Sequence, residues 1–335
     1  MAVLDSAGRV EVNLLSSQVA AHAQFGGVVP ELASREHLRA LPALVNEALR
    51  GAGGPPEMVA VTAGPGLVGA LLVGVRFAAA FARARRLPLA AVDHLMGHLV
   101  SPFLSEHGEP AATMPAGVLA LVASGGHSGW LLLEHGHATP LCRTRDDAAG
   151  ETLDKVAQAL GLPYPGGPVI DRLAREGNPR GVELPQPRLK DGSLAFSFSG
   201  LKSAAIRFVD QHGLRGVGEQ RATQPVRDLA ASLERAVVEQ LLAPLPQLSA
   251  RHRVGMVTAS GGVSANHWLR ESLEQRCHEL GLELRLPARG LTTDNAAMVA
   301  RAGQLAVDRG DVADPLRLDA YGREAWQPPG MRRAV

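Results

Sequence analysis

The chain has 335 residues, 46% of them hydrophobic, which is enough for about two globular domains that each have a core of their own. Its 34 basic and 33 acidic residues give a formal net charge of +1, so no global field attracts nucleic acid and any RNA contact must be local or shared with a partner. Cys142 and Cys277 lack C-x-x-C spacing, and no signal peptide or apolar run of roughly 18 residues suggests export or a membrane span. We therefore expect a reduced, cytoplasmic protein.

Strands and helices are predicted to alternate along the chain. Short apolar runs that end in glycine turns indicate strands, and apolar residues three or four positions apart indicate helices. In the first part of the chain we expect a hairpin over 2–5 and 10–15, a helix over 34–50 that is kinked or broken at Pro42, a strand over 58–62 and a helix over 67–84. In the middle we expect a hairpin over 118–122 and 130–133, helices over 146–160 and from 170, a surface excursion over 177–191, and a short strand over 196–200 before a helix from 201. In the last part we expect a helix over 225–242, a strand over 254–258, a helix from 265, a strand over 282–286 and a helix start at 292–295. This order predicts an α/β fold with substantially parallel sheets.

Two histidines four residues apart, His94 and His98, would lie on one face of a helix, where both imidazoles could reach a single ion. Neutral imidazole is a common ligand of zinc, iron, nickel and copper. Leu95 stands where a zinc protease of the H-E-x-x-H type has its catalytic Glu, so the water-activating carboxylate of that class is missing. The alternative is an ordinary pair of packed histidines.

A third ligand is required, and Asp294 is the candidate. It follows two threonines at the start of an Ala-rich helix. Together with His94 and His98 it would complete a set of two histidines and one carboxylate. The alternative for Asp294 is a helix cap or an acid that favours the first turn of the helix.

Two Ser-Gly-Gly turns follow predicted strands in different halves of the chain, which hints at a duplicated architecture. Glycines in Ser124-Gly125-Gly126 would let backbone N–H groups face an anion, although an ordinary tight turn is the alternative. Ser260-Gly261-Gly262 lies between a strand and a helix, where ligands bind in open α/β sheets. Asn266 after this turn either recognises an adenine edge or caps the helix.

Asp154 and Asp171 are single carboxylates near glycine turns. Acidic residues bind ribose hydroxyls in dinucleotide sites, which makes both candidates for sugar contacts. Solvated helix faces are the alternative for each.

Nine ordered segments together resemble one family, that of the tRNA N6-adenosine threonylcarbamoyltransferases (TsaD). The segments are GGVVPELASREH at 26–37, TAGPGLVGALLVG at 62–74, DHLMGH at 93–98, SGGH at 124–127, DDAAGETLDKVA at 146–157, YPGGPVIDRLA at 164–174, FSFSGLK at 196–202, SGGVSANHWLR at 260–270 and TTDNAAM at 292–298. The segments are spread from residue 26 to residue 298, so the match runs over nearly the whole chain.

The resemblance implies a two-lobed fold of the actin/hexokinase/Hsp70 (ASKHA) type with duplicated sheet domains around a nucleotide cleft. One lobe would comprise residues 1–115 and 295–335 and the other residues 116–294. One iron or zinc ion would be held by His94, His98 and Asp294. The adenylate of the substrate would be held by Val122, Ala123, Ser124, Gly125, Gly126, Asp154, Gly167, Asp171 and Asn266.

The resemblance also implies the reaction. A threonylcarbamoyl group would move from threonylcarbamoyl-adenylate to N6 of the adenosine beside the anticodon, in tRNAs that read codons beginning with A. A related partner subunit of the TsaB type and a small ATPase of the TsaE type would work with the chain. No residue is assigned as general base.

The chain departs from the family pattern at its start. The family begins with a strand carrying a motif like Gly-Ile-(Asp/Glu)-Thr-Ser-Cys-Asp-Asp-Thr, and residues 2–5 correspond to the strand after it. We therefore expect a fold without that first strand and phosphate loop. A smaller departure is Ala123, where members commonly have Val directly before Ser-Gly-Gly. Three alternatives remain: a metalloendopeptidase, an inactive nucleotide-binding scaffold, and a small-molecule carbamoyltransferase.

Overall fold

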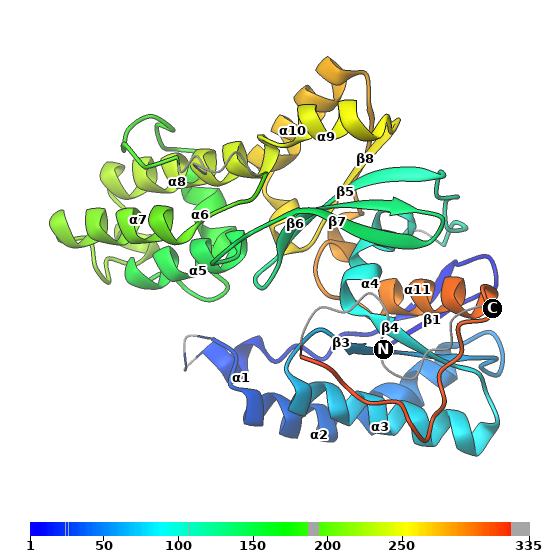
Figure 1. Ribbon diagram of the computed structural model, residues 1–335. Coiled ribbons are helices and arrows are strands. Elements are labelled where there is room, and N and C mark those ends of the chain that lie inside the picture. Colours follow the sequence, from blue (N-terminus) through cyan, green and yellow to red (C-terminus); the bar gives the residue numbers. More distant parts are fainter. Residues whose placement is uncertain (24, 26, 107, 187–193, 323–335) are drawn as a thin grey trace. The chain divides into compact units, whose positions relative to one another are not determined.

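The computed structural model describes residues 1–335 except 24, 26, 107, 187–193 and 323–335 (Figure 1). The chain forms two compact units. Unit 1 comprises Met1–Met114, Gly136–Ala138 and Pro287–Val335, and unit 2 comprises Pro115–His135 and Thr139–Leu286. The return to unit 1 therefore begins at Pro287, before the predicted residue 295, and Asp294 belongs to the same unit as His94 and His98.

Unit 1 contains two small sheets and the helices around them. β1 and β2 pair in antiparallel fashion, as the predicted hairpin requires, and β3 and β4 pair in parallel. Its elements are β1 (Ala2–Leu4), β2 (Val10–Asn13), α1 (Val19–Ala23), α2 (Pro30–Gly51), β3 (Val59–Gly64), α3 (Val68–Arg85), β4 (Leu89–Asp93), α4 (His94–Val100) and α11 (Ala296–Asp308), with short 3-10 turns at Ser101–Phe103 and Arg289–Leu291.

Close packing fixes α11 against the parallel sheet of unit 1. A Cβ atom on Gly303 would lie 2.4 Å from Cβ of Ala60 and 3.3 Å from Cβ of Ala90, so the helix approaches β3 and β4 as closely as side chains allow. α4 also packs on α11, and in this contact Gly97 of α4 lies against the side chain of Met298. The start of α11 and the start of α4 are thus held within one rigid arrangement.

The predicted break at Pro42 is absent. α2 runs without interruption from Pro30 to Gly51 and begins earlier than predicted. The lost backbone hydrogen bond is tolerated because the helix packs along α3 and buries Ala33, Val45 and Ala48.

Unit 2 is built on a five-stranded sheet in the order β7-β6-β5-β8-β9, and Figure 1 shows α5 to α8 at the left of this sheet and α9 and α10 above it. β5, β8 and β9 are parallel, and β6 is antiparallel to β5. The elements are β5 (Gly117–Ala123), β6 (Ser128–Glu134), β7 (His137–Arg143), α5 (Ala149–Ala159), α6 (Gly167–Ala174), α7 (Ser199–Gln211), α8 (Gln224–Leu242), α9 (Leu245–His252), β8 (Met256–Ser260), α10 (His267–Leu280) and β9 (Glu283–Arg285), with 3-10 turns at Glu219–Arg221 and Gly262–Ala265. Both cysteines are buried and free in this unit.

The structure differs from the prediction at two strands of unit 2. β7 was not predicted, and it contains Pro140, which a central strand would exclude; β7 is the edge strand of its sheet, where proline is tolerated. The predicted strand over 196–200 is reduced to one bridge between Thr144 and Phe196. Asp146 takes the place of a partner strand, because its Oδ1 accepts hydrogen bonds from the N–H groups of Phe198 and Ser199.

The predicted surface excursion over 177–191 lies partly outside the described residues, since 187–193 are not among them.

Candidate functional site

The two histidines of unit 1 lie on α4, which begins directly at the end of β4. Asp93 caps the helix, because its Oδ1 accepts a hydrogen bond of 2.9 Å from the N–H of Leu95, while its Oδ2 accepts one from the Tyr321 hydroxyl at 2.7 Å. The cap starts the helix at His94, and the spacing of four then brings His98 beneath it. The two ring centroids are 4.7 Å apart, with the planes at 73°.

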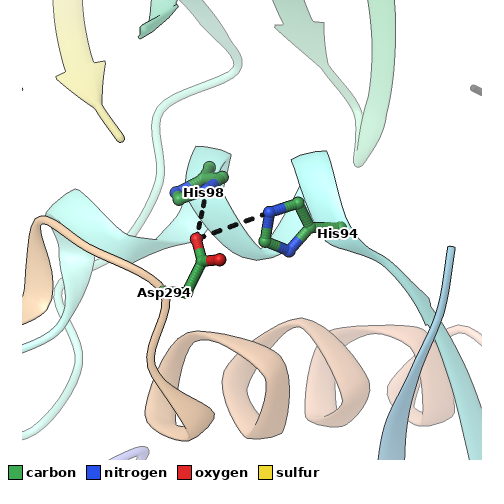
Figure 2. A group of neighbouring side chains, drawn as sticks. All are labelled: His94, His98 and Asp294. Atoms are coloured by element: carbon green, nitrogen blue, oxygen red, sulfur yellow. Dashed lines mark ion pairs between the residues drawn. The ribbon is translucent and has the colours of Figure 1, made fainter. Parts of the chain in front are cut away.

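Asp294 reaches both rings from the loop before α11, as Figure 2 shows. Its Oδ1 lies 3.1 Å from Nε2 of His98 and 3.5 Å from Nε2 of His94. Asn295, not Asp294, caps α11, since its Oδ1 accepts a hydrogen bond of 2.8 Å from the N–H of Met298. The Asp294 carboxylate is therefore directed at the histidines instead of the helix end.

The chemistry of this group fits a transition metal. The His98 side chain is 0% exposed, and in the described part of the chain neither of its ring nitrogens has a hydrogen-bond partner; the contact with Asp294 is an ion-pair distance without hydrogen-bond geometry. A buried nitrogen without a partner is costly. Ligand atoms of all three residues lie within 4.8 Å of one another, and two imidazoles with one carboxylate suit iron or zinc.

Residues that the sequence did not single out hold the Asp294 loop. The buried Ser101 hydroxyl, at the end of α4, donates to the carbonyl of Leu291 at 2.7 Å. Asn295 Nδ2 donates to the carbonyl of Thr293 at 2.9 Å. Asn295 could have been found as a capping residue at a helix start, whereas nothing in the sequence marks Ser101.

Asn295→Ala is expected to weaken metal binding by about 10 to 100-fold, because it removes the contacts that orient the Asp294 loop. Loss of the helix cap should also lower the free energy of unfolding by about 1 kcal/mol. Competition with a chelator and denaturant unfolding measure the two effects. Asn46→Ala, an exposed change on α2, is the control, and equal metal affinity in both variants would contradict the role of Asn295.

The first Ser-Gly-Gly turn of unit 2 follows β5. Val122 and Ala123 are buried and paired with β6, so their side chains belong to the core of the sheet. The Ser124 hydroxyl accepts hydrogen bonds from the N–H groups of His127 at 3.1 Å and Gly126 at 3.4 Å, which closes the turn. Gly125 and Gly126 are exposed, and a Cβ atom on either would meet no atom within 4 Å, so this backbone is open to a ligand.

The two Ser-Gly-Gly turns are in contact. Gly261, at φ +87°, lies so near the end of β5 that a Cβ atom would be 2.4 Å from the carbonyl oxygen of Ala123. Gly150, at the start of α5, is equally close to the first turn, because a Cβ atom added to Gly150 would lie 2.6 Å from the carbonyl oxygen of Ser124. Glycine is required at these contacts because backbone lies where a side chain would be.

Asp154 on α5 is hydrogen-bonded to the turn that precedes α6. Its Oδ1 accepts hydrogen bonds from the N–H groups of Gly166 at 2.8 Å and Gly167 at 3.2 Å. Burial raises the pKa of Asp154, and these two hydrogen bonds oppose the rise without cancelling it. Asp154 therefore positions Gly167, and the solvated-face alternative for Asp154 is wrong.

Asp171 and Asn266 belong to one hydrogen-bonded network in unit 2. Asp171 Oδ1 accepts from Asn266 Nδ2 at 2.9 Å, from the N–H of His267 at 3.0 Å and from His267 Nδ1, while its Oδ2 accepts from Arg175 at 2.8 Å. Burial alone would raise the pKa of Asp171, but the hydrogen bonds from His267 and Arg175 hold it below its usual range. Asn266 also caps α10, since its Oδ1 accepts from the N–H of Leu269 at 2.9 Å.

Glu234 on α8 completes this network, and the sequence analysis missed it. Its Oε1 accepts from Asn266 Nδ2 at 2.5 Å. The signal was present, because Glu234 lies on the same helix face as the apolar Ala230 and Val237. Ligand atoms of Asp171, Glu234 and His267 lie within 4.8 Å of one another, but these atoms already bond to one another or to Asn266, so we describe the group as a hydrogen-bonded network and not a metal site.

Among the described residues, no helix combines the length and the apolar character needed to cross a membrane.

A sequence profile of the TsaD family, described as tRNA N6-adenosine threonylcarbamoyltransferase, matches residues 9–301.

Curated relatives extend the similarity over most of the chain. The tRNA N6-adenosine threonylcarbamoyltransferase of Moorella thermoacetica is 47% identical over 325 residues, which cover 95% of this chain and 91% of the relative. That of Geobacter metallireducens is 45% identical over 323 residues, again covering 95% and 91%.

Similarity to solved structures concerns the fold. Full-length HypF, in a phosphate- and nucleotide-bound crystal structure, has a TM-score of 0.53 at 12% identity; the match covers 79% of this chain and only 49% of the HypF chain. It agrees with the predicted α/β fold of the actin/hexokinase/Hsp70 type, and that prediction is confirmed. On the profile match and the near-complete relatives, the chain belongs to the tRNA N6-adenosine threonylcarbamoyltransferase family.

Proposed function

We propose that this protein transfers the threonylcarbamoyl group from threonylcarbamoyl-adenylate to N6 of adenosine 37, next to the anticodon, in tRNAs that read codons beginning with A. The product is the modified nucleoside t6A. Membership in the family supports the reaction. The single structural observation that carries it is the convergence of His94, His98 and Asp294, because a purely structural protein needs no such set of ligand atoms.

His94, His98 and Asp294 would hold one Fe²⁺ or Zn²⁺ ion. When bound, such an ion supplies a Lewis acid that polarises carbonyl or phosphate oxygens. The protein's own contribution is to hold the ligands ready: Asp93 sets the start of α4, and Ser101 and Asn295 hold the Asp294 loop.

Residues of unit 2 would bind the adenylate part of the substrate. The exposed backbone of the turn at 124–126 would approach an anion at Gly125, and Asp154 would position Gly167 beside the ligand at the start of α6 by accepting a hydrogen bond from its N–H. Asp171 and Asn266 would face the nucleoside. Val122 and Ala123 would support the turn from the sheet, since their side chains are buried.

The reaction balances with AMP as leaving group. The N6 amine attacks the carbamoyl carbon, a C–N bond forms, the bond from this carbon to the phosphate oxygen breaks, and AMP departs with the electron pair while N6 loses a proton. Positioning and fixed backbone dipoles supply the acceleration that this chain's residues can give. No side chain is assigned as general base.

We propose three partners besides the adenylate substrate: tRNA, a related subunit of the TsaB type and a small ATPase of the TsaE type. The formal net charge of +1 supports a shared tRNA surface, since the chain has no strong positive field of its own. A tRNA substrate agrees with the predicted cytoplasmic location.

The metalloendopeptidase alternative is not favoured. Leu95 is 3% exposed and packs into the core, so the helix that carries the histidines offers no carboxylate at the position that a zinc protease of the H-E-x-x-H type uses. The similarity to HypF, at 12% identity, concerns the fold and does not indicate a substrate for this chain.

Transfer is expected to depend on bound metal. The protein would be incubated with partner subunits, threonylcarbamoyl-adenylate and unmodified tRNA, after which the tRNA is digested and its nucleosides are weighed by mass spectrometry. We expect t6A with the metal-loaded protein, loss of t6A after treatment with a chelator, and recovery when Fe²⁺ or Zn²⁺ is restored. Metal-loaded protein that makes no t6A with all partners present, or that cleaves casein in a chelator-sensitive manner, would overturn the proposal.

A further inference from the structure

Glu234 is a buried carboxyl group that the proposed reaction does not use. It lies in the middle of α8 with 1% of its surface exposed. Its Oε1 accepts a hydrogen bond from the Asn266 amide, but in the part of the chain that the structure describes its Oε2 is buried without any hydrogen-bond partner. An ionised carboxylate in such surroundings would be strongly disfavoured, because one of its charged oxygens is buried and receives no hydrogen bond from the described residues.

The charged groups that face Glu234 come from two neighbouring helices. Asp171 lies on α6, Arg175 directly follows the last residue of that helix, and His267 begins α10. Burial, reinforced by the negative charge of Asp171, raises the pKa of Glu234 to about 8, against the hydrogen bond from Asn266 and the charge of Arg175. Among the described residues, no charged side chain of α7, which also packs on α8, contributes to this shift.

Glu234 is therefore the neutral member of a pair of carboxyl groups. Asp171, held by Arg175 and His267, keeps its negative charge, whereas Glu234 keeps its proton at neutral pH. Both accept hydrogen bonds from the same Asn266 NH2 group. Since the Asn266 oxygen is held by the N–H of Leu269, the amide is fixed on three sides.

We propose that Glu234, in its protonated form, is a positioning residue that holds the Asn266 amide for adenylate binding, and that loss of this proton weakens binding. The inference rests on the proposed adenylate site. Ionisation would set a second negative charge against Asp171 on the same amide, and the network must then rearrange to separate the two charges.

The first test follows the Asn266 amide itself. The chain has five asparagines, so selective 15N-asparagine labelling gives few side-chain NH2 signals, and an Asn266→Ser variant assigns the relevant pair. We expect these signals to shift between pH 6.5 and 9.5 with a midpoint near the pKa of Glu234, about 8. They should stay constant in Glu234→Gln, which keeps the shape and the acceptor of the neutral acid but cannot ionise.

Glu239→Gln is the matched control, because it makes the same change on the same helix at a half-exposed position. This variant should titrate like the unsubstituted protein. Signals of Asn266 that do not move with pH, or that move equally in Glu234→Gln, would overturn the inference.

The second test measures AMP binding by calorimetry over the same pH range. If AMP binds only the form with neutral Glu234, affinity falls about tenfold one pH unit above the pKa of that group. The second proton of the AMP phosphate has a pKa of about 6, so above about pH 7.5, where the loss of affinity is expected, the ligand does not add a titration. We expect the alkaline loss in the unsubstituted protein and in Glu239→Gln, but not in Glu234→Gln.

The outcomes separate the two proposals. AMP binding with the same pH dependence in Glu234→Gln overturns the role of Glu234 and leaves the adenylate site standing. Absence of AMP binding at every pH overturns the adenylate site and with it the binding role of Glu234. The Asn266 signals still decide whether the protonation of Glu234 determines the position of the Asn266 side-chain amide. The Asn266 signals and AMP binding are both measured without tRNA, so a loss of threonylcarbamoyl transfer that has another cause does not change either result.

Discussion

Asp294→Asn is expected to lower metal affinity by at least about 100-fold and to abolish threonylcarbamoyl transfer, while the fold stays intact. The carboxylate Oδ1 lies 3.1 Å and 3.5 Å from the two histidine nitrogens, and asparagine would place a neutral amide there. Changes to groups that only orient metal ligands already cost 10 to 100-fold, so loss of a ligand should cost more. Because the Asp294 side chain is 75% exposed and does not cap α11, the free energy of unfolding should change by less than about 0.5 kcal/mol.

The control for Asp294→Asn is Asp319→Asn, the same substitution at another exposed aspartate of unit 1, which pairs with Arg76 and accepts a hydrogen bond from the N–H of Ala320. It should retain both metal and transfer. Metal analysis of the purified variants and mass spectrometry of tRNA nucleosides provide the two readouts. Full metal content in Asp294→Asn would remove the metal role of the site.

Gly261→Ala is expected to lower the free energy of unfolding by about 2 to 4 kcal/mol and to remove AMP binding. Gly261 has φ +87° and ψ 160°, a region that is nearly exclusive to glycine. The added Cβ would lie 2.4 Å from the carbonyl oxygen of Ala123, so the turn must move away from the end of β5. Thermal and denaturant unfolding measure the first effect, and calorimetry with AMP measures the second.

Gly125→Ala is the matched change in the other Ser-Gly-Gly turn. A Cβ atom there meets no atom within 4 Å, and Gly125 is not among the described glycines with positive φ. Its free energy of unfolding should stay within about 0.5 kcal/mol of the unsubstituted protein. Equal stability of the two glycine variants would show that the close contact between the two turns is not rigid.

Local patterns were enough to find most elements and both histidines. Hydrophobic runs bounded by glycine turns placed β3, β5, β6 and β8 to within a few residues, because a buried strand needs a continuous apolar run. The spacing of His94 and His98 placed both rings on one helix face, since the repeat of a helix is fixed. No strand was predicted at the place of β7; it contains Pro140, which an edge strand tolerates, and sequence does not show which strand lies at the edge of a sheet.

Contacts between distant segments required the folded chain. Asp294 and Asn295 are adjacent residues that can both cap a helix, and only the packing of α11 on β3, β4 and α4 assigns the cap to Asn295 and directs Asp294 to the histidines. Glu234 lies on the apolar face of α8, but the groups that surround its carboxyl group come from α6 and α10 and are known only from the folded chain. Local sequence sets backbone preference and the face that a side chain occupies, but the partner of a charge, and hence its protonation state, depends on segments that folding brings together from far along the chain.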